Sequence, residues 1–227
     1  MKPILACALI AAVITAASSQ AAILVGIDSI TYTGSAPAQG GLNLDNPSNL
    51  INGSGLSEPL TAANIDSVIH AAVAFGNGGN AWATTDPGGP GSDFFASTSE
   101  TVSFELIFDG TYELTNFYNW SYGFGSANGN NIRSVTFDFG VGNFDSSTGN
   151  ITLTAITPAS TLSNTPINLT ADRVRINVVD NYFGVAGFDG GDRVGAAEFA
   201  FLAVPEPSSA LLAGFGLLAL LRRRRAA

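Results

Sequence analysis

Two segments of the chain place aromatic side chains among polar residues. Trp82 follows the segment 76–80, which consists of glycine and asparagine, and Trp120 and Tyr122 lie at the start of a second polar stretch. An aromatic ring can cover the C–H face of a pyranose while neighbouring amides and guanidinium groups bond to its hydroxyls. We therefore predict a polysaccharide-binding site that contains Trp82, Trp120, Tyr122 and Arg133.

The same four residues have a second interpretation, which the sequence leaves open. Trp120 ends a stretch in which apolar and polar residues alternate, so core packing is the alternative for this ring, and equally for Trp82 and Tyr122. Arg133 could instead lie on a solvated strand face or pair with Glu105.

The sequence offers little for catalysis. His70 is the only histidine, and it lies in the apolar segment 68–73 without a nucleophile elbow. Two of the 18 acidic residues could act together in glycoside hydrolysis, but no pair is marked by its spacing. We expect a protein without enzymatic activity, and a polysaccharide hydrolase is the least favoured alternative.

The last segment of the chain, 204–227, has an organisation of its own. Its uncharged run 209–221 would be about 20 Å long as a helix, just enough for a single transmembrane helix. The arginines that follow should stay on the cytoplasmic side, with the body of the protein outside. The sorting-motif residues that flank the run are Val204, Pro205, Glu206 and Pro207 before it and Arg222, Arg223, Arg224 and Arg225 after it.

This order of a proline-glutamate-proline triplet, a short apolar span and terminal arginines resembles the PEP-CTERM sorting tail of Gram-negative bacteria. The resemblance implies recognition by an exosortase, with cleavage near residues 205–207. It also implies a membrane-anchored intermediate in the inner membrane and delivery to the cell surface or extracellular matrix. An anchor that is never cut is the alternative.

Residues 1–21 are predicted to be a signal peptide. Lys2 supplies the positive charge, 4–17 the apolar core, and 19–21 the small residues that a signal peptidase reads. Cleavage is expected after Ala21. Cys7 would suit a lipoprotein anchor, but too few residues precede it.

Charge and length describe the exported part. Five of the nine basic residues and the only cysteine lie in the terminal segments, while all 18 acidic residues lie between Asp28 and Glu206. The four remaining arginines against 18 acids leave a net charge of −14, which disfavours nucleic acid as a partner. Without a thiol, disulfides and zinc–thiolate sites are excluded. Residues 22–203 have the length of one domain.

Short alternating segments dominate this domain. Period-two patterns occupy 101–108, 132–139 and 173–178. Further candidate strands are 68–75, 112–120, 150–156 and 195–202. Because no long helical pattern interrupts them, we predict an all-β antiparallel β-sandwich, and within that class a jelly roll.

The order of several short segments resembles the discoidin or galactose-binding-like domains. These segments are Asn49-Leu50-Ile51-Asn52-Gly53-Ser54-Gly55, the strand 102–108 with 109–114, the loop 119–122, 132–137, and the ending 171–178 with 195–199. The resemblance implies an eight-stranded jelly roll whose end loops contact glycans.

The same resemblance implies a structural calcium ion, with Asn52 and Glu198 as its candidate ligands. The family's entry loop usually has aspartate where Asn52 stands. Calcium prefers six to eight oxygens that include carboxylates, so the neutral amide weakens this prediction.

Together these features predict a secreted, exosortase-sorted protein with a carbohydrate-binding module that binds exopolysaccharide. A structural biofilm protein without a ligand is the alternative.

Overall fold

The computed structural model describes residues 21–40, 43–71, 80–122, 128–156 and 162–204. The predicted transmembrane helix and nearly all of the predicted signal peptide lie outside these residues. Within the described ranges, no helix has the length and apolar character needed to cross a membrane.

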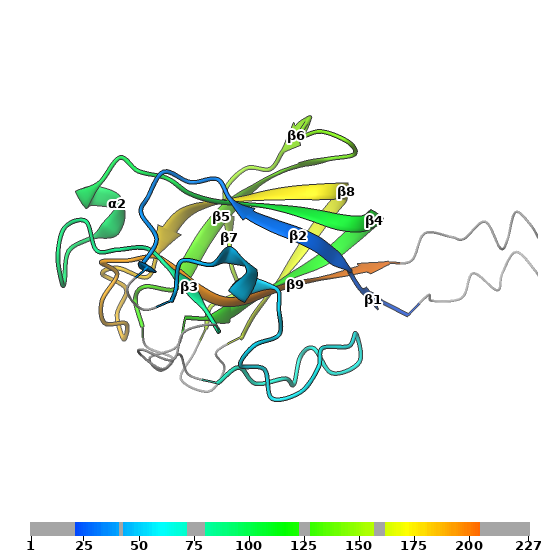
Figure 1. Ribbon diagram of the computed structural model, residues 1–227, viewed down its shortest axis with the longest axis horizontal. Helices are drawn as coiled ribbons and strands as arrows, with labels where there is room; N and C mark the ends of the chain where they lie inside the picture. Colours follow the sequence, from blue (N-terminus) through cyan, green and yellow to red (C-terminus); the bar gives the residue numbers. More distant parts are fainter. Residues whose placement is uncertain (1–20, 41–42, 72–79, 123–127, 157–161, 205–227) are drawn as a thin grey trace, which may run out of the picture.

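Two long strands, β4 (Val102–Ser121) and β8 (Leu162–Asn181), connect the two layers of the fold (Figure 1). Bulges interrupt the pairing of β4 with β8 between Ile107 and Tyr112 and between Leu114 and Asn116. Because bulges bend strands, each long strand continues from one layer into the other. The first half of β4 and the second half of β8 therefore belong to one layer, and their other halves to the second.

The remaining strands complete these layers, and all pairings between named strands are antiparallel. In the first layer, β2 (Ile27–Tyr32) pairs with β4 and β5 (Ile132–Gly140) with β8. Short strands β6 (Ser146–Ser147) and β7 (Ile151–Thr152) add to β5. In the second layer, β9 (Gly195–Val204) pairs with β4, and with the short strands β1 (Ile23–Leu24) and β3 (Trp82–Ala83). The described helices are η2 (Pro47–Leu50) and α2 (Phe94–Ser97).

Aromatic side chains fill the space between the layers. Phe117 of β4 contacts Phe137 of β5 with ring centroids 5.4 Å apart, and Phe104 contacts Phe199 at 5.6 Å. These contacts join residues of opposite layers, as a sandwich core requires. The structure is therefore an all-β antiparallel sandwich, as predicted, while the jelly-roll strand order stays a prediction.

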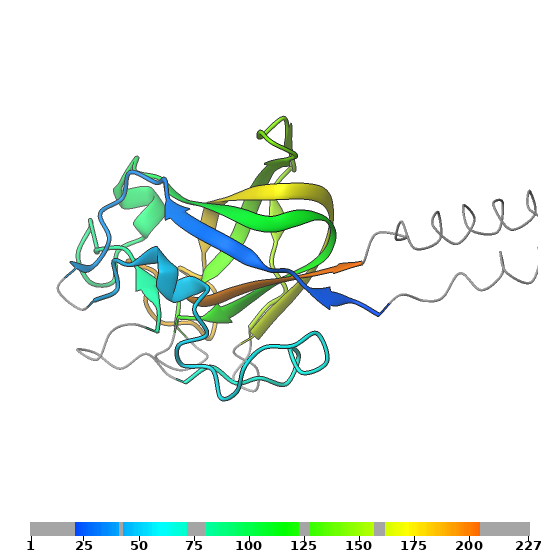
Figure 2. The same ribbon diagram turned by 45° about the vertical axis from the view of Figure 1, so that its right-hand side comes forward.

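A smaller apolar cluster lies on the other side of the second layer. It contains Trp120, Ala200 and Leu202 from the sheet, together with Leu44 and Ile65. The segment from Asn43 onward passes over this side of β9 (Figure 2). A loop without regular strands thus covers the outer side of β9.

Some predicted strands differ from the observed ones. Residues 68–71 form only an isolated bridge between His70 and Leu56, and the rest of the predicted strand 68–75 lies outside the described residues. Of the predicted strand 150–156, only Ile151–Thr152 pairs. In the described part of this segment, Val68 and His70 are buried and Ile69 and Ala71 are exposed, without the pairing of a regular strand.

Candidate functional site

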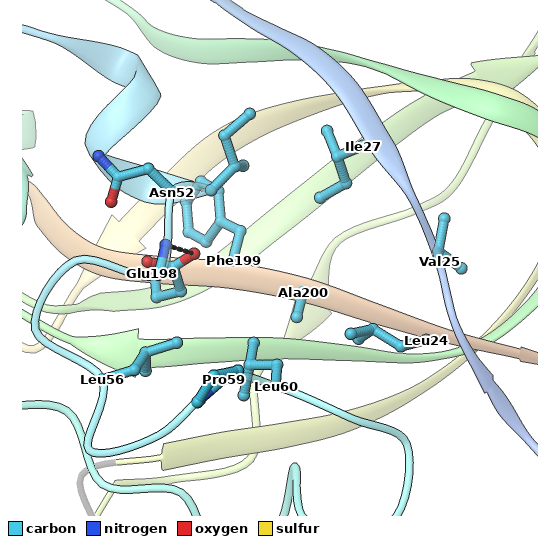
Figure 3. Close-up of a pocket in the computed structure, with 12 residues that line it drawn as sticks. Leu24, Val25, Ile27, Asn52, Leu56, Pro59, Leu60, Glu198, Phe199 and Ala200 are labelled. Carbon is cyan, nitrogen blue, oxygen red and sulfur yellow. Dashed lines mark hydrogen bonds between the residues drawn. The ribbon is translucent and has the colours of Figure 1, made fainter.

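Glu198 lies on β9 and is 2% exposed. Its neighbour Phe199 points into the aromatic core, whereas Glu198 contacts the loop that follows η2. A pocket of about 280 Å³ lies here, between β9, the start of the domain and this loop (Figure 3). Its lining residues are Leu24, Val25, Ile27, Ile51, Asn52, Gly53, Leu56, Pro59, Leu60, Glu198, Phe199 and Ala200.

The carboxyl group of Glu198 has few hydrogen-bond partners. The Gly53 N–H donates to its Oε1 at 3.1 Å, and its Oε2 has no hydrogen-bond partner among the described residues. Burial among apolar side chains disfavours the charged form and raises the pKa of Glu198 to about 8, against a smaller opposite effect of the Gly53 N–H. At neutral pH the group is therefore mostly a neutral acid.

A capped helix and an Asx turn position the Gly53 N–H next to the Glu198 carboxyl group. Asn46 caps η2 and Pro47 begins it, which brings the chain to the loop. The Ser54 N–H then donates to Asn52 Oδ1 at 2.7 Å, an Asx turn. Gly53 has φ +70°, a conformation that suits glycine.

His70 holds the far side of the same loop. Its Nε2 lies 2.9 Å from the Ser54 carbonyl oxygen and its Nδ1 lies 2.7 Å from that of Ala71. Burial is the main cause that lowers the pKa of His70. A Cβ on Gly55 would lie 2.6 Å from His70 Cε1, so ring and loop are in close contact. The geometry gives His70 a role in fixing the loop.

The structure brings the two predicted calcium ligands, Asn52 and Glu198, to one pocket, but their surroundings do not fit a calcium ion. The carbonyl oxygens of loop residues 53, 54 and 55 accept from Leu56 N–H, the His70 ring and Ala71 N–H. No group of three or more His, Cys, Asp or Glu side chains that could hold a metal occurs in the described part of the chain. One carboxylate is too few oxygen ligands. The lining residues therefore argue against the calcium site that the resemblance implied.

The three candidate sugar-stacking rings are buried, which contradicts an exposed aromatic platform. Trp82 and Trp120 are fully buried and Tyr122 is 2% exposed. Trp82 packs in the inner core against Phe104, with centroids 4.7 Å apart, and Trp120 Nε1 donates to the Val68 carbonyl at 3.0 Å. Core packing, the alternative interpretation, describes all three: Trp82 lies in the core between the layers, and Trp120 and Tyr122 lie in the smaller apolar cluster.

Arg133 is paired, but with a different acid from the one expected. Its Nη1 lies 3.0 Å from Asp180 Oδ2, and both side chains are 42% exposed. Glu105 instead accepts from Arg175 at 3.1 Å. Of the two alternatives for Arg133, the pair with Glu105 is wrong, because β8, not β5, is the neighbour of β4, and the exposed side chain lies on a solvated strand face.

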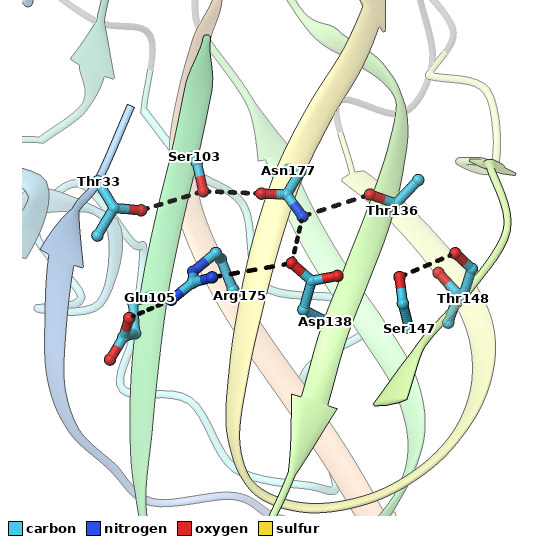
Figure 4. A network of polar contacts seen from close by, with 9 residues as sticks. All are labelled: Thr33, Ser103, Glu105, Thr136, Asp138, Ser147, Thr148, Arg175 and Asn177. Carbon is cyan, nitrogen blue, oxygen red and sulfur yellow. Dashed lines mark hydrogen bonds and ion pairs between the residues drawn. The ribbon is translucent and has the colours of Figure 1, made fainter. Parts of the chain in front are cut away.

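A second group of polar side chains lies on the outer face of the first layer (Figure 4). Ser103 Oγ donates to Asn177 Oδ1 at 2.9 Å, and Asn177 Nδ2 donates to Asp138 Oδ2 at 3.0 Å. In the next cross-strand row, Arg175 of β8 lies between Glu105 of β4 and Asp138 of β5. Its guanidinium lies 4.2 Å from the centroid of the Phe144 ring. We call this the polar sheet face; its residues are Thr33, Ser103, Glu105, Thr136, Asp138, Arg175 and Asn177.

The polar sheet face was not among the predicted site residues. Its sequence signal was present in the polar positions of three alternating segments, 101–108, 132–139 and 173–178. Which strands are neighbours could not be read from that signal, so the rows across β4, β8 and β5 became visible only in the fold.

Residues 203–225 match the family model of the PEP-CTERM protein-sorting motif. No curated protein matches the sequence. The motif indicates a secreted protein that an exosortase sorts through a membrane-anchored intermediate.

Similar solved structures include the family 32 carbohydrate-binding module of Clostridium perfringens NanJ in complex with galactose. It has 11% identity and a TM-score of 0.46, covering 80% of this chain and 98% of that one. An F5/8 type C domain from Bacteroides fragilis has 15% identity and a TM-score of 0.43, covering 79% and 97%. A Clostridium perfringens module, CpGH89CBM32-5, in complex with GalNAc-beta-1,3-galactose has 14% identity and a TM-score of 0.41, covering 76% and 94%.

Proposed function

We propose that this chain is a cell-surface or extracellular-matrix protein whose β-sandwich binds a polysaccharide at the polar sheet face. The observation that carries the binding proposal is the array of hydroxyl, amide, carboxylate and guanidinium groups on three adjacent strands. Sugar hydroxyls both donate and accept hydrogen bonds, so such an array suits a glycan chain.

The exposure of the polar sheet face supports this role. The side chains of Arg175, Glu105 and Asp138 are 33%, 28% and 30% exposed. Adjacent strands lie about 4.8 Å apart, which places polar groups at regular intervals. Arg175 stacks on Phe144, so an aromatic ring lies next to the polar rows.

The position of the sorting motif supports cleavage without damage to the sandwich. β9 ends at Val204, and the proline-glutamate-proline triplet begins at the next residue. Cleavage near 205–207 would therefore leave each described strand whole. The acidic exported part would repel nucleic acid and other polyanions, so a neutral polysaccharide is the proposed ligand.

A structural matrix protein without a ligand is the second candidate. The burial of Trp82, Trp120 and Tyr122 favours it, since these rings are the usual partners of a pyranose face. In that role the sandwich would contribute only an acidic, soluble surface.

Calorimetric titration of the full chain in detergent, with exopolysaccharide from the source cells, tests the proposal. We expect saturable binding by the wild type and loss of binding by Asn177→Ala. Asn116→Ala is the matched control, because Asn116 also bonds an amide across strands, to Asn164 Oδ1 at 2.8 Å, but in the other layer.

Each result has one meaning. Binding that both variants retain would remove the polar sheet face as the site. No saturable binding by the wild type would favour the structural matrix protein. Export is tested separately by replacing Pro205, Glu206 and Pro207 with alanine in the source cell, which should leave the protein in the inner membrane.

A further inference from the structure

The Asn52–Gly53 pair lies next to the buried carboxyl group of Glu198. We propose that Asn52 is a site of self-catalysed deamidation, in which Glu198 is the catalytic base. This modification goes beyond the proposed function and does not depend on it. The argument rests on the positions of three groups: a nucleophile, a base and a hydrogen-bond donor to the reacting carbonyl.

The nucleophile is the backbone nitrogen of Gly53. Deamidation begins when the nitrogen that follows an asparagine attacks the Cγ of that asparagine, and glycine has no side chain to shield its nitrogen. The Gly53 N–H donates to Glu198 Oε1 at 3.1 Å (Figure 3). The proton that must leave this nitrogen therefore already points at a carboxyl oxygen, within the distance that general-base catalysis requires.

The Asn52 side chain is held in an Asx turn beside its own backbone. Its Oδ1 accepts the Ser54 N–H at 2.7 Å, so the same donor can stabilise the negative charge that develops on this oxygen during addition. Asn52 and Gly53 are both exposed, which admits water for the second step.

The reaction balances without any other component. The Gly53 nitrogen gives its proton to Glu198 Oε1 and forms a bond to Asn52 Cγ. The bond from Cγ to Nδ2 breaks, and ammonia leaves with the proton that Glu198 returns. Water then opens the cyclic imide at either C–N bond, giving aspartate or isoaspartate at position 52.

A second Asn-Gly pair in the described residues provides a matched comparison. Asn128 has the same Asx turn, because its Oδ1 accepts the Asn130 N–H at 2.9 Å. The Gly129 N–H, however, donates to the Asp189 carbonyl oxygen, a peptide oxygen that is not a base. Asn128 and Gly129 are also buried. Of these two described pairs, the Asn52 pair alone combines the turn with a carboxyl group and with exposure to water.

The test follows deamidation by peptide mass mapping of the full chain at about pH 9, where Glu198 is mostly ionised and can accept a proton. The chain is incubated either folded in buffer or unfolded in urea at this pH. Unfolding removes both turns and the Glu198 contact. We expect Asn52 to react at least about a hundredfold faster in the folded chain, the lower end of the range for a positioned base. Asn128 should react more slowly folded than unfolded. Exposure alone cannot make a folded site faster than an unfolded one.

Glu198→Gln sharpens the test by removing the base while keeping the shape of the side chain. The folded rate at Asn52 should fall to the unfolded rate or below, and the rate at Asn128 should not change. Should the variant not fold, the ratio of folded to unfolded rates in the wild type still decides. An Asn52 that reacts no faster folded than unfolded overturns the proposal, as does an unchanged rate in a folded Glu198→Gln.

Discussion

The polar sheet face and the Glu198 pocket both place carboxyl groups on strands of the same sandwich, but in opposite surroundings. On the polar sheet face, Glu105 and Asp138 lie on either side of Arg175, at 3.1 and 4.0 Å, and all three are about one third exposed. In the pocket, Glu198 is 2% exposed, receives one N–H and has one oxygen without a partner.

The difference shows how the surroundings decide the form in which an acid is stable. A partly exposed carboxylate keeps some of its hydration and is also paired with a guanidinium. Because water screens this ion pair, the pair contributes little to the free energy of unfolding. A buried acid without a cation avoids the cost of a buried charge by binding a proton. The two regions should therefore respond to different experiments, the pocket to pH and the polar sheet face to salt.

The largest effect should be the pH dependence that Glu198 gives to stability. Its pKa is raised from the ordinary 4.5 to about 8 in the folded chain, so between these pH values the folded state binds more protons than the unfolded state. The stabilising contribution is complete below about pH 4.5 and decreases as the pH rises to about 8, by a few kcal/mol in total. Urea unfolding at a series of pH values measures it.

Glu198→Gln should remove this decline, because the amide cannot release a proton. The quantity to compare is the difference in unfolding free energy between variant and wild type at each pH, which cancels the other acids. Asn116→Ala, which changes no ionisable group, serves as the control and should give a flat difference. A flat difference for Glu198→Gln would mean that the carboxyl is not buried in solution.

A smaller effect is expected when Arg175 is replaced by alanine. The change leaves Glu105 and Asp138 without their shared cation and removes the contact with Phe144. Because the groups are partly exposed, the free energy of unfolding should fall by about 1 kcal/mol. Urea unfolding at low and high salt measures it, and the loss should shrink at high salt. A loss that is equal at both salt concentrations would assign the effect to packing.

Several strands were predictable from their residue patterns. The alternating segment 132–139 appears as β5 almost unchanged, because half-buried strands repeat every two residues. The segment 195–202 appears as β9, although nearly all of its residues are buried. The predicted strands 101–108 and 112–120 proved to be one bent strand, β4. The turn signal at Asp109–Gly110 looks the same in sequence whether a strand ends or bends.

The candidate site was only partly predictable for a related reason. The pairing of the Asn52 loop with Glu198 was expected from the order of motifs, and the structure places both in one pocket. Trp82 is buried between the layers, whereas the burial of Trp120 depends on the covering loop, whose path has no periodic signal. Residue types revealed which side chains could stack on a sugar, but not which of them face water.

A still smaller effect should follow from Arg133→Ala. Its ion pair with Asp180 is 3.0 Å long, but both side chains are 42% exposed. Water competes for both charges, so we expect a loss of at most about 0.5 kcal/mol in the free energy of unfolding. A double-mutant cycle with Asp180→Ala measures the pair itself. A coupling well above this value would show that the pair is shielded in solution.

The smallest expected effect is that of calcium on freshly purified protein. Because Glu198 is the only carboxylate lining the pocket and the loop carbonyls already accept protein donors, the melting temperature should be the same with calcium and with a chelator. Asn52→Asp adds a second carboxylate, so calcium should raise the melting temperature of this variant. If Asn52 deamidates as proposed, aged wild-type protein should gain a calcium response as aspartate accumulates. A response in fresh wild-type protein would instead mean that the loop rearranges around the ion and that the carbonyls exchange their present donors for it.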